Sequence, residues 1–213
     1  MAKIFELIDS RLKDEEEGLL TRILNQHELL IFPTETFYGL GGLVFFHSVY
    51  QKIFDLKGRQ ANKPLPFCAS DLDMVLSFIE KPPASFFRLA RTFWPGPMTL
   101  VLRAREGLIP ESLPWMGQTI AVRVPSPSWL RQLIQKAGAL LISTSANLSG
   151  QPPLSSFDEV YRTFAGQVGF FINGGETPGG KPSTIVDLAG PEPVCLREGK
   201  IPLVEIQHVL LGD

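Results

Sequence analysis

The sequence predicts a mixed α/β fold in which helices flank one twisted, mixed β-sheet. The first observation is that short apolar runs of strand length alternate with segments of helical periodicity. The second is that several of these runs follow one another with only a turn between them, which a purely parallel sheet does not allow. The third is the length of 213 residues, so we expect a single domain over residues 1–213.

Helices are predicted where apolar residues recur every three or four positions. The first follows the acidic run at residues 14–17, whose charges suit the positive end of a helix dipole. Asp71 is a suitable N-cap for the third helix, and the pair Trp94-Pro95 ends the fourth. These signals predict helices at residues 19–24, 49–56, 72–79, 86–93, 128–137, 155–164 and 202–210.

Strands are predicted at the apolar runs between these helices. The first run ends at Pro33, because proline has no backbone N–H to donate to a sheet. The runs at residues 98–103 and 119–124 have the usual length of a strand. The predicted strands are residues 29–32, 65–69, 98–103, 119–124, 140–143, 168–172, 184–188 and 194–196.

Composition and residue spacing exclude several functional classes. The chain has 20 Lys and Arg against 22 Asp and Glu, unlike a strongly basic nucleic-acid coat protein. No apolar stretch is long enough to cross a membrane, and the charged N-terminal residues do not resemble a secretory signal. Cys68 and Cys195 stand alone, so we expect reduced thiols and a cytoplasmic location. The three histidines lack the spacing of metal ligands, so no metal site is predicted.

The glycine-rich motif near position 180 resembles a phosphate-binding loop but does not predict one. Residues 175–181 fit the pattern G-x-x-x-x-G-K of a phosphate-binding loop. Such a loop needs Ser or Thr at the next position and then a helix. Here Pro182 follows, and residues 183–187 have the pattern of a strand. We therefore expect a flexible loop close to a site.

Polar residues follow two of the predicted buried strands. Residues 33–41 (PTETFYGLG) place threonine hydroxyls and glycines at the end of one strand. Residues 142–150 (ISTSANLSG) place four hydroxyls and Asn147 at the end of another. Such groups at a strand end either contact a ligand or form an ordinary hydrogen-bonded turn. No histidine base lies nearby in the sequence, which disfavours a hydrolase triad.

Basic residues occur at three places where an anion could bind. Lys57, Arg59 and Lys63 lie within seven residues at the end of a predicted helix. There they either bind a phosphate or carboxylate or complement the helix dipole. Arg123 and Arg197 each end an apolar strand, where a buried guanidinium needs an anionic partner from a ligand or a structural ion pair.

Together these blocks resemble the YrdC-like threonylcarbamoyl-AMP synthase family, in its short single-domain form. The matching blocks lie at residues 33–41, 57–65, 93–101, 121–125, 143–150, 183–187 and 197–199. The resemblance implies an open α/β fold with a concave, basic cavity. It also implies a nucleotidyltransferase, L-threonylcarbamoyladenylate synthase, which makes threonylcarbamoyl-AMP and pyrophosphate from L-threonine, bicarbonate and ATP. That intermediate would serve the threonylcarbamoyladenosine modification of tRNA through separate downstream transferase proteins.

The resemblance also implies a role for individual residues. As catalytic residues it implies Lys57 and Arg59. As threonine-binding residues it implies Thr36, Arg123, Ser145 and Ser183. As nucleotide-binding residues it implies Arg59, Lys63, Thr119, Asn147, Ser155 and Arg197. Mg²⁺ is expected to arrive with the ATP, weak RNA or tRNA binding is compatible with the family, and Cys68 is expected in the wall of the cavity.

Three alternatives stay open at this point. The chain could be a non-enzymatic RNA-binding module, although it lacks the aromatic stacking motif of RNA-recognition domains. It could be a carbamoyl-handling domain of hydrogenase maturation, although it lacks the zinc-finger cysteines found in those chains. It could also be an inactive paralogue, although residues 57–59 and 145–147 match the family pattern.

Overall fold

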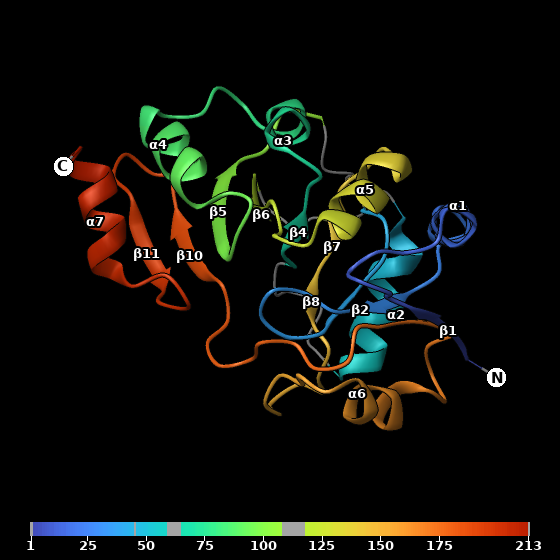
Figure 1. The fold of residues 1–213 in the computed structure, drawn as a ribbon. Coiled ribbons are helices and arrows are strands. Elements are labelled where there is room, and N and C mark those ends of the chain that lie inside the picture. The colour runs from blue at the N-terminus through green and yellow to red at the C-terminus, as the bar shows by residue number, and fades with distance from the viewer. Residues whose placement is uncertain (1, 45, 59–64, 108–117, 213) are drawn as a thin grey trace.

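The chain forms a mixed α/β architecture in which helices flank two β-sheets (Figure 1). The structure is a computed structural model that describes residues 2–44, 46–58, 65–107 and 118–212. The predicted combination of a mixed sheet and flanking helices is present, but the strands divide between two sheets where the sequence predicts one. Among the described residues, no helix is long and apolar enough to cross a bilayer.

The first sheet contains five strands. In spatial order they are β1 (Lys3–Glu6), β9 (Phe170–Asn173), β2 (Leu30–Phe32), β3 (Gly39–Gly41) and β8 (Thr144–Ser145). Strands β1 and β2 run parallel to β9, whereas β3 is antiparallel to both of its neighbours. The sequence predicts β2 and β9 but not the other three. Glycines fill β3 and hydroxyl residues fill β8, so neither has the apolar pattern typical of a strand.

The second sheet contains six strands. In spatial order they are β11 (Val194–Arg197), β10 (Thr184–Asp187), β5 (Met98–Arg103), β6 (Thr119–Arg123), β4 (Phe67–Cys68) and β7 (Leu141–Ile142). Two of its pairs are parallel, β10 with β5 and β4 with β6, and the other pairs are antiparallel. All six strands coincide with predicted strands, and the mixed pairing is confirmed.

Seven helices flank these sheets in the described parts of the chain. They are α1 (Asp14–Asn25), α2 (His47–Lys57), α3 (Leu72–Phe78), α4 (Ala84–Phe93), α5 (Ser128–Ala137), α6 (Phe157–Phe164) and α7 (Leu203–Leu211). Each contains most of a predicted helix. The acidic run belongs to the first turn of α1, and Asp71 caps α3 by accepting a hydrogen bond from Met74 N at 2.8 Å.

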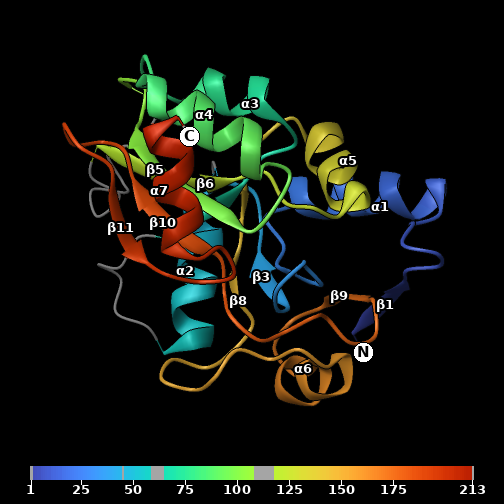
Figure 2. The same cartoon turned by 60° about the vertical axis from the view of Figure 1, so that its left-hand side comes forward.

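Two clusters of buried apolar side chains hold the layers together. Helices α1 and α5 pack against each other and cover one cluster (Figure 2), with Leu20 and Leu130 fully buried. Glu17 of α1 forms an ion pair with Lys136 of α5 across this contact. The other cluster lies under α2, α4, α6 and α7 and extends between the sheets. Both clusters are large enough to fix the relative positions of the strands by burial of apolar surface.

Two chain segments pass from one sheet to the other. Ser143 connects β7 in the second sheet directly to β8 in the first. Residues 174–183 lead from β9 in the first sheet to β10 in the second, and along this path Gly179 N donates to Thr36 O at 2.7 Å. A strand follows this glycine-rich segment, so the argument against a phosphate-binding loop of the helix-linked type is confirmed. The two crossings bring three polar segments close together, namely residues 33–41, 142–150 and 174–183.

Candidate active site

A cavity of about 580 Å³ opens where the two sheets meet. The first sheet contributes Gly39 and Ser145 to its wall, and the second contributes Thr99, Ala121 and Ile185. This volume is typical of a pocket for a small molecule or a nucleotide. The cavity is therefore built by strand ends that lie far apart in the sequence.

Most of the predicted site residues lie in or beside this cavity. Its lining includes six of them: Thr36, Thr119, Arg123, Ser145, Ser183 and Arg197. Lys57, Asn147 and Ser155 lie outside the lining, although the first two bond to the segment of Ser145. Arg59 and Lys63 lie outside the described residues. Cys68 differs from its expected place, because it is fully buried behind the wall while its neighbour Phe67 lines the cavity.

Arg123 is buried in the wall and paired with a carboxylate. Its Nη1 donates to Glu35 Oε1 at 2.8 Å, and the two side chains are only 9% and 12% exposed. Burial alone lowers the pKa of Arg123, but the neighbouring Cys68 and Glu35 favour the charged guanidinium, so its pKa is raised. Its side chain also bonds to that of Cys68, and Arg123 belongs to the lining of the cavity, where its donors can bind an anion.

The two threonines beside Glu35 form an ordered pair of hydroxyls. Thr34 Oγ1 donates its only hydroxyl proton to Phe37 O at 2.7 Å. It must therefore accept the hydrogen bond that links it to Thr36 Oγ1 at 3.1 Å, so Thr36 is the donor in that contact. Among the described residues no group donates to Thr36 Oγ1, so a ligand in the cavity could donate to it.

A second guanidinium lies close to the first. Arg197 donates from Nε and Nη2 to Ser183 O at 3.1 and 2.8 Å, and from Nη2 to Ser183 Oγ at 3.1 Å. Thr99 Oγ1 lies 3.0 Å from the same Ser183 hydroxyl. Partial burial and the positive charge of Arg123 both lower the pKa of Arg197. The mutual repulsion of these two guanidinium groups favours the binding of an anion between them.

Lys57 holds the segment that carries Ser145. Its ammonium group donates to Ser145 O at 2.5 Å, to Asn147 O at 2.8 Å and to Asn147 Oδ1 at 3.0 Å. Ser145 Oγ also donates to Asn147 Oδ1, and Asn147 Nδ2 donates to Gln151 O, both at 2.5 Å. The predicted proximity of the two motifs is therefore present, and the ammonium group of Lys57 is directed at this turn.

An apolar strip of the second sheet lies beside the arginines. It consists of Val101, Ala121, Ile185 and Leu196, all in the lining. Thr119 and Asp187 belong to the same lining, and Asp187 Oδ1 accepts a hydrogen bond from Ala189 N at 2.8 Å. A flat apolar strip with polar groups beside it can hold a planar ring.

Ser155 lies beside the segment that crosses between the sheets. Its backbone oxygen accepts hydrogen bonds from Thr177 N at 2.9 Å and from Thr177 Oγ1 at 3.2 Å. The space beside the Gly179 Cα atom is bounded by the Ser155 side chain. The serine is therefore close to the loop that touches Thr36, although it does not line the cavity.

Sequence reasoning missed Glu35, Thr99 and Asp187. A signal for Glu35 exists, because a buried arginine at position 123 requires an anionic partner. However, Glu35 lies 88 positions from Arg123 in the sequence, and local patterns do not indicate which residues at such a separation are in contact. Thr99 and Asp187 are single polar residues in apolar strands, and only the sheet register brings them to the cavity.

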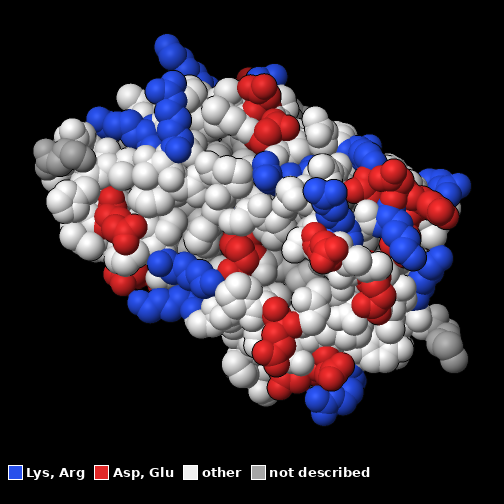
Figure 3. All heavy atoms as spheres, viewed as in Figure 1, with Lys and Arg blue, Asp and Glu red and all other residues white. Residues whose placement is uncertain are grey.

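The arrangement suits a ligand that carries both negative charge and an apolar ring. Guanidinium groups, hydroxyls and the apolar strip share one cavity. Over the face seen in Figure 3, basic and acidic side chains of the described residues alternate, without one continuous basic area.

Comparisons with known proteins agree with this geometry. Residues 22–199 match the Sua5/YciO/YrdC family, which carries the description telomere recombination. The chain is 34% identical over 203 residues to a threonylcarbamoyl-AMP synthase of Pyrococcus abyssi, covering 95% of this chain and 59% of that protein. The crystal structure of P. abyssi Sua5 complexed with L-threonine matches with a TM-score of 0.90 and 34% identity, over 98% of this chain and 61% of that one.

A shorter solved structure has nearly the same extent. The crystal structure of E. coli YciO matches with a TM-score of 0.84 and 25% identity, over 94% of this chain and 97% of that one. The chain thus spans about three fifths of the P. abyssi protein and almost all of YciO. Because the family match covers most of the chain, this protein belongs to the Sua5/YciO/YrdC family.

Proposed function

We propose that this chain is an L-threonylcarbamoyladenylate synthase that works as one domain over residues 1–213. It forms threonylcarbamoyl-AMP and pyrophosphate from L-threonine, bicarbonate and ATP. One observation carries the proposal: Arg123, Arg197 and the hydroxyls of Thr36 and Ser183 share a single cavity beside an apolar strip. The similarity to a threonylcarbamoyl-AMP synthase supports the same conclusion.

The amino acid binds at the end of the cavity that holds Arg123. The carboxylate of threonine accepts hydrogen bonds from the free edge of this guanidinium, which offers a planar fork of donors. Thr36, Ser145 and Ser183 contact the remaining polar groups of threonine. The placement of these hydroxyls in the same lining supports this assignment.

The nucleotide binds along the second sheet. Its base lies on the apolar strip of Val101, Ala121 and Ile185, and Thr119 contacts its polar edge. Arg197 binds the phosphates or the ribose, and Asn147 and Ser155 contribute from the neighbouring turns. Arg59 and Lys63, which lie outside the described residues, bind the phosphates of ATP.

Lys57 acts in this site as a positioning residue. Its three bonds to the segment of residues 145–147 support a role in holding Ser145 and Asn147 in place. This differs from direct contact with phosphate, which the resemblance implies for the pair Lys57 and Arg59. The charge of Lys57 still adds to the positive potential at the cavity.

The chemistry needs alignment and positive charge more than a nucleophilic side chain. The amine of threonine combines with bicarbonate to give a carbamate and water. A carbamate oxygen then attacks the α-phosphate of ATP, and pyrophosphate leaves. The nucleophile is already anionic, so the site has to orient it and stabilise charge on the phosphates. Arg123 and Arg197 make the cavity basic enough for this task.

Mg²⁺ enters this scheme with the phosphates of ATP. Among the described residues, no three His, Cys, Asp or Glu side chains gather as a metal site. An ion carried by the nucleotide suits such a cavity, because Mg²⁺ commonly takes its ligands from phosphates and water. The product would be consumed by separate transferase proteins that modify tRNA.

A pyrophosphate-release assay tests the proposal. The purified chain is incubated with ATP, and L-threonine or bicarbonate is omitted in turn. We expect release of pyrophosphate only when all three are present, and loss of release in Arg197→Gln but not in Arg103→Gln, whose side chain is exposed and bonds to Ala189 O. Release that ignores threonine would indicate another acceptor. No release would indicate an inactive paralogue, and salt-dependent tRNA binding without turnover would indicate an RNA-binding module.

A further inference from the structure

Glu35 leaves one oxygen of its carboxylate unused beside the cavity. Its Oε1 accepts the bond from Arg123, whereas Oε2 is buried and has no hydrogen-bond partner in the described parts of the chain. The residue lies between Thr34 and Thr36, which both line the cavity. A buried carboxylate oxygen without a donor is costly, so a donor supplied by a ligand would stabilise this arrangement.

We infer that Glu35 binds the ammonium group of the amino-acid substrate while Arg123 binds its carboxylate, and so makes the site selective for a zwitterion. The inference rests on the proposed function and deepens it by naming the group that recognises the substrate nitrogen. An amino acid carries both charges on neighbouring atoms, and the Glu35–Arg123 pair presents the two opposite charges side by side at 2.8 Å. Each charge of the ligand then meets its complement.

A second acceptor lies next to Glu35. Thr36 Oγ1 donates to Thr34, as the hydrogen bonds of Thr34 require, and in the described parts of the chain no group donates to it, so it can accept from a ligand. An ammonium group has three donors. Glu35 Oε2 and Thr36 Oγ1 can accept two of them, which leaves the third for water or for a later reaction partner.

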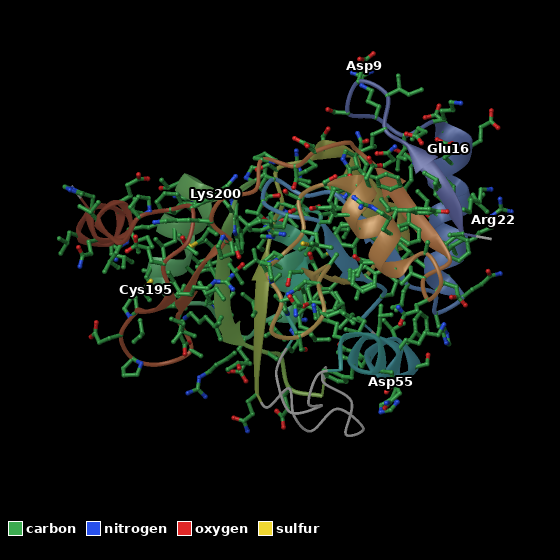
Figure 4. The ribbon with its side chains drawn as sticks, turned by 90° about the horizontal axis from the view of Figure 1, so that it is seen from below. Asp9, Glu16, Arg22, Asp55, Cys195 and Lys200 are labelled. Atoms are coloured by element: carbon green, nitrogen blue, oxygen red, sulfur yellow. The ribbon has the colours of Figure 1, made fainter. Side chains whose placement is uncertain are left out.

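The backbone around Glu35 is held on both sides. Lys200, labelled in Figure 4, donates from Nζ to Glu35 O at 2.8 Å, and Gly179 N donates to Thr36 O at 2.7 Å. The main chain is therefore fixed, and the carboxylate can adjust by rotation about its last bond. That rotation is soft in glutamate and moves both oxygens together, so a small rotation can turn Oε2 toward a bound ammonium group while Oε1 stays within reach of Arg123.

The negative charge of Glu35 also acts against the wrong ligands. A carboxylic acid that lacks an amine would bring its carboxylate close to Glu35 and offer no ammonium group in return. Like charges at such a distance repel each other strongly in a site with little water. Selectivity then arises from repulsion as well as attraction, which is how binding sites usually discriminate between similar molecules.

Calorimetric titration of matched ligands tests the inference. L-Threonine, L-2-aminobutyrate, which lacks only the hydroxyl, and (R)-3-hydroxybutyrate, which lacks only the amine, are titrated into the wild-type chain. We expect (R)-3-hydroxybutyrate to bind at least about 30-fold more weakly than threonine, because it leaves Glu35 unpaired. The dissociation constant of L-2-aminobutyrate should lie within about tenfold of that of threonine. Equal binding of threonine and hydroxybutyrate by the wild-type chain would overturn the inference.

A variant separates the role of the charge from that of the fold. Glu35→Gln keeps an oxygen for Arg123 and removes the negative charge. We expect its affinity for threonine to fall at least about tenfold and its preference for threonine over hydroxybutyrate to shrink. Glu28→Gln is the control, because Glu28 pairs with Lys52 on the surface, and it should bind like the wild type. An undiminished preference in a folded Glu35→Gln protein would overturn the inference.

The outcomes also separate this inference from the proposed function. If Glu35→Gln does not fold, as judged by thermal unfolding, the ligand series on the wild-type chain decides alone. A wild-type chain that turns over threonine but binds hydroxybutyrate equally well overturns the role of Glu35 and leaves the proposed function intact. A wild-type chain that binds no threonine overturns both.

Discussion

Lys57 Nζ lies 3.0 Å from Asn147 Oδ1 and 2.8 Å from the backbone oxygen of the same residue. A buried ammonium group at the end of α2 thereby joins the turn after β8, 90 positions further along the chain. The same group bonds to Ser145 O, so the end of one helix fixes the hydroxyl and amide groups beside the cavity. A basic residue at the site thus shapes the wall that binds ligands.

Replacement of Lys57 by methionine should destabilise the fold. The substitution removes the charge and takes one donor away from each of three oxygen atoms. We expect the free energy of unfolding to fall by about 3 kcal/mol, measured by urea denaturation. Lys52→Met is the control, because Lys52 is exposed on the same helix, and it should cost less than about 1 kcal/mol. Equal losses in the two variants would contradict the role of Lys57 in holding the turn.

Replacement of Arg123 by lysine should weaken the binding of threonine more than that of ATP. Lysine keeps the charge beside Glu35 but loses the planar fork that holds a carboxylate. We expect the KM for threonine to rise at least about tenfold and the KM for ATP to change less than about threefold. Steady-state pyrophosphate release at varied substrate concentrations measures both. A larger rise in the KM for ATP would move Arg123 to the nucleotide end of the site.

Tyr38 should make the fold sensitive to alkaline pH. Its hydroxyl donates to Gly175 O at 2.9 Å and accepts from Gly174 N at 3.1 Å, and burial raises its pKa to about 12 from the ordinary 10.0. Folding therefore favours the neutral phenol. This contribution is complete below pH 10.0 and is lost as the pH rises to about 12. We expect a loss of about 3 kcal/mol of stability over that range.

The variant Tyr38→Phe isolates this effect from the titration of other groups. Urea denaturation at several pH values between 9.5 and 11.5, about the range in which the phenol titrates in the unfolded chain, gives the slope of stability against pH. The slope should be shallower in Tyr38→Phe than in the wild type. Parallel slopes for Tyr38→Phe and the wild type would contradict the buried, neutral phenol.

Gly41 should tolerate no side chain. A Cβ atom there would lie 1.6 Å from Ile142 O, because β3 passes directly against the backbone that leads into β8. We expect Gly41→Ala to lower the free energy of unfolding by at least about 3 kcal/mol in urea denaturation. Gly18 is the control, because it lies in the exposed middle of α1 and a Cβ atom added there would meet no neighbouring group within 4 Å. Gly18→Ala should raise the free energy of unfolding by about 0.5 kcal/mol. A stable Gly41→Ala protein would contradict the close contact of the two segments.

The sequence predicts the helices and the second sheet well, because their signals are local. Helix α5 begins and ends at the predicted residues 128 and 137, and Asp71 is the cap that its position before α3 suggests. Strands β3 (Gly-Leu-Gly) and β8 (Thr-Ser) escape prediction because glycines and hydroxyl residues lack the pattern of a strand. Pairing between β3 and β8, which lie far apart in the sequence, makes β8 a strand, and tertiary pairing also divides the strands into two sheets.

The site follows the same division between local and distant signals. Hydroxyls and arginines at strand ends predict six residues of the cavity lining from local pattern and family resemblance. The partner of Arg123 is not predictable in this way, since any of the acidic residues could lie against it until the fold is known. Nor does the sequence indicate that the ammonium group of Lys57 bonds to backbone oxygens. Both contacts depend on the crossing of chain segments between the sheets.

Mass spectrometry of the nucleotide product formed in ¹³C-bicarbonate tests the central claim most directly. The chain is incubated with ATP, L-threonine and the labelled salt, and the products are separated at once. We expect an adduct of AMP that contains threonine and a single labelled carbon, formed together with pyrophosphate. Consumption of ATP without such an adduct, or an adduct that lacks the label, would contradict the assignment of this cavity to threonylcarbamoyl-AMP synthesis.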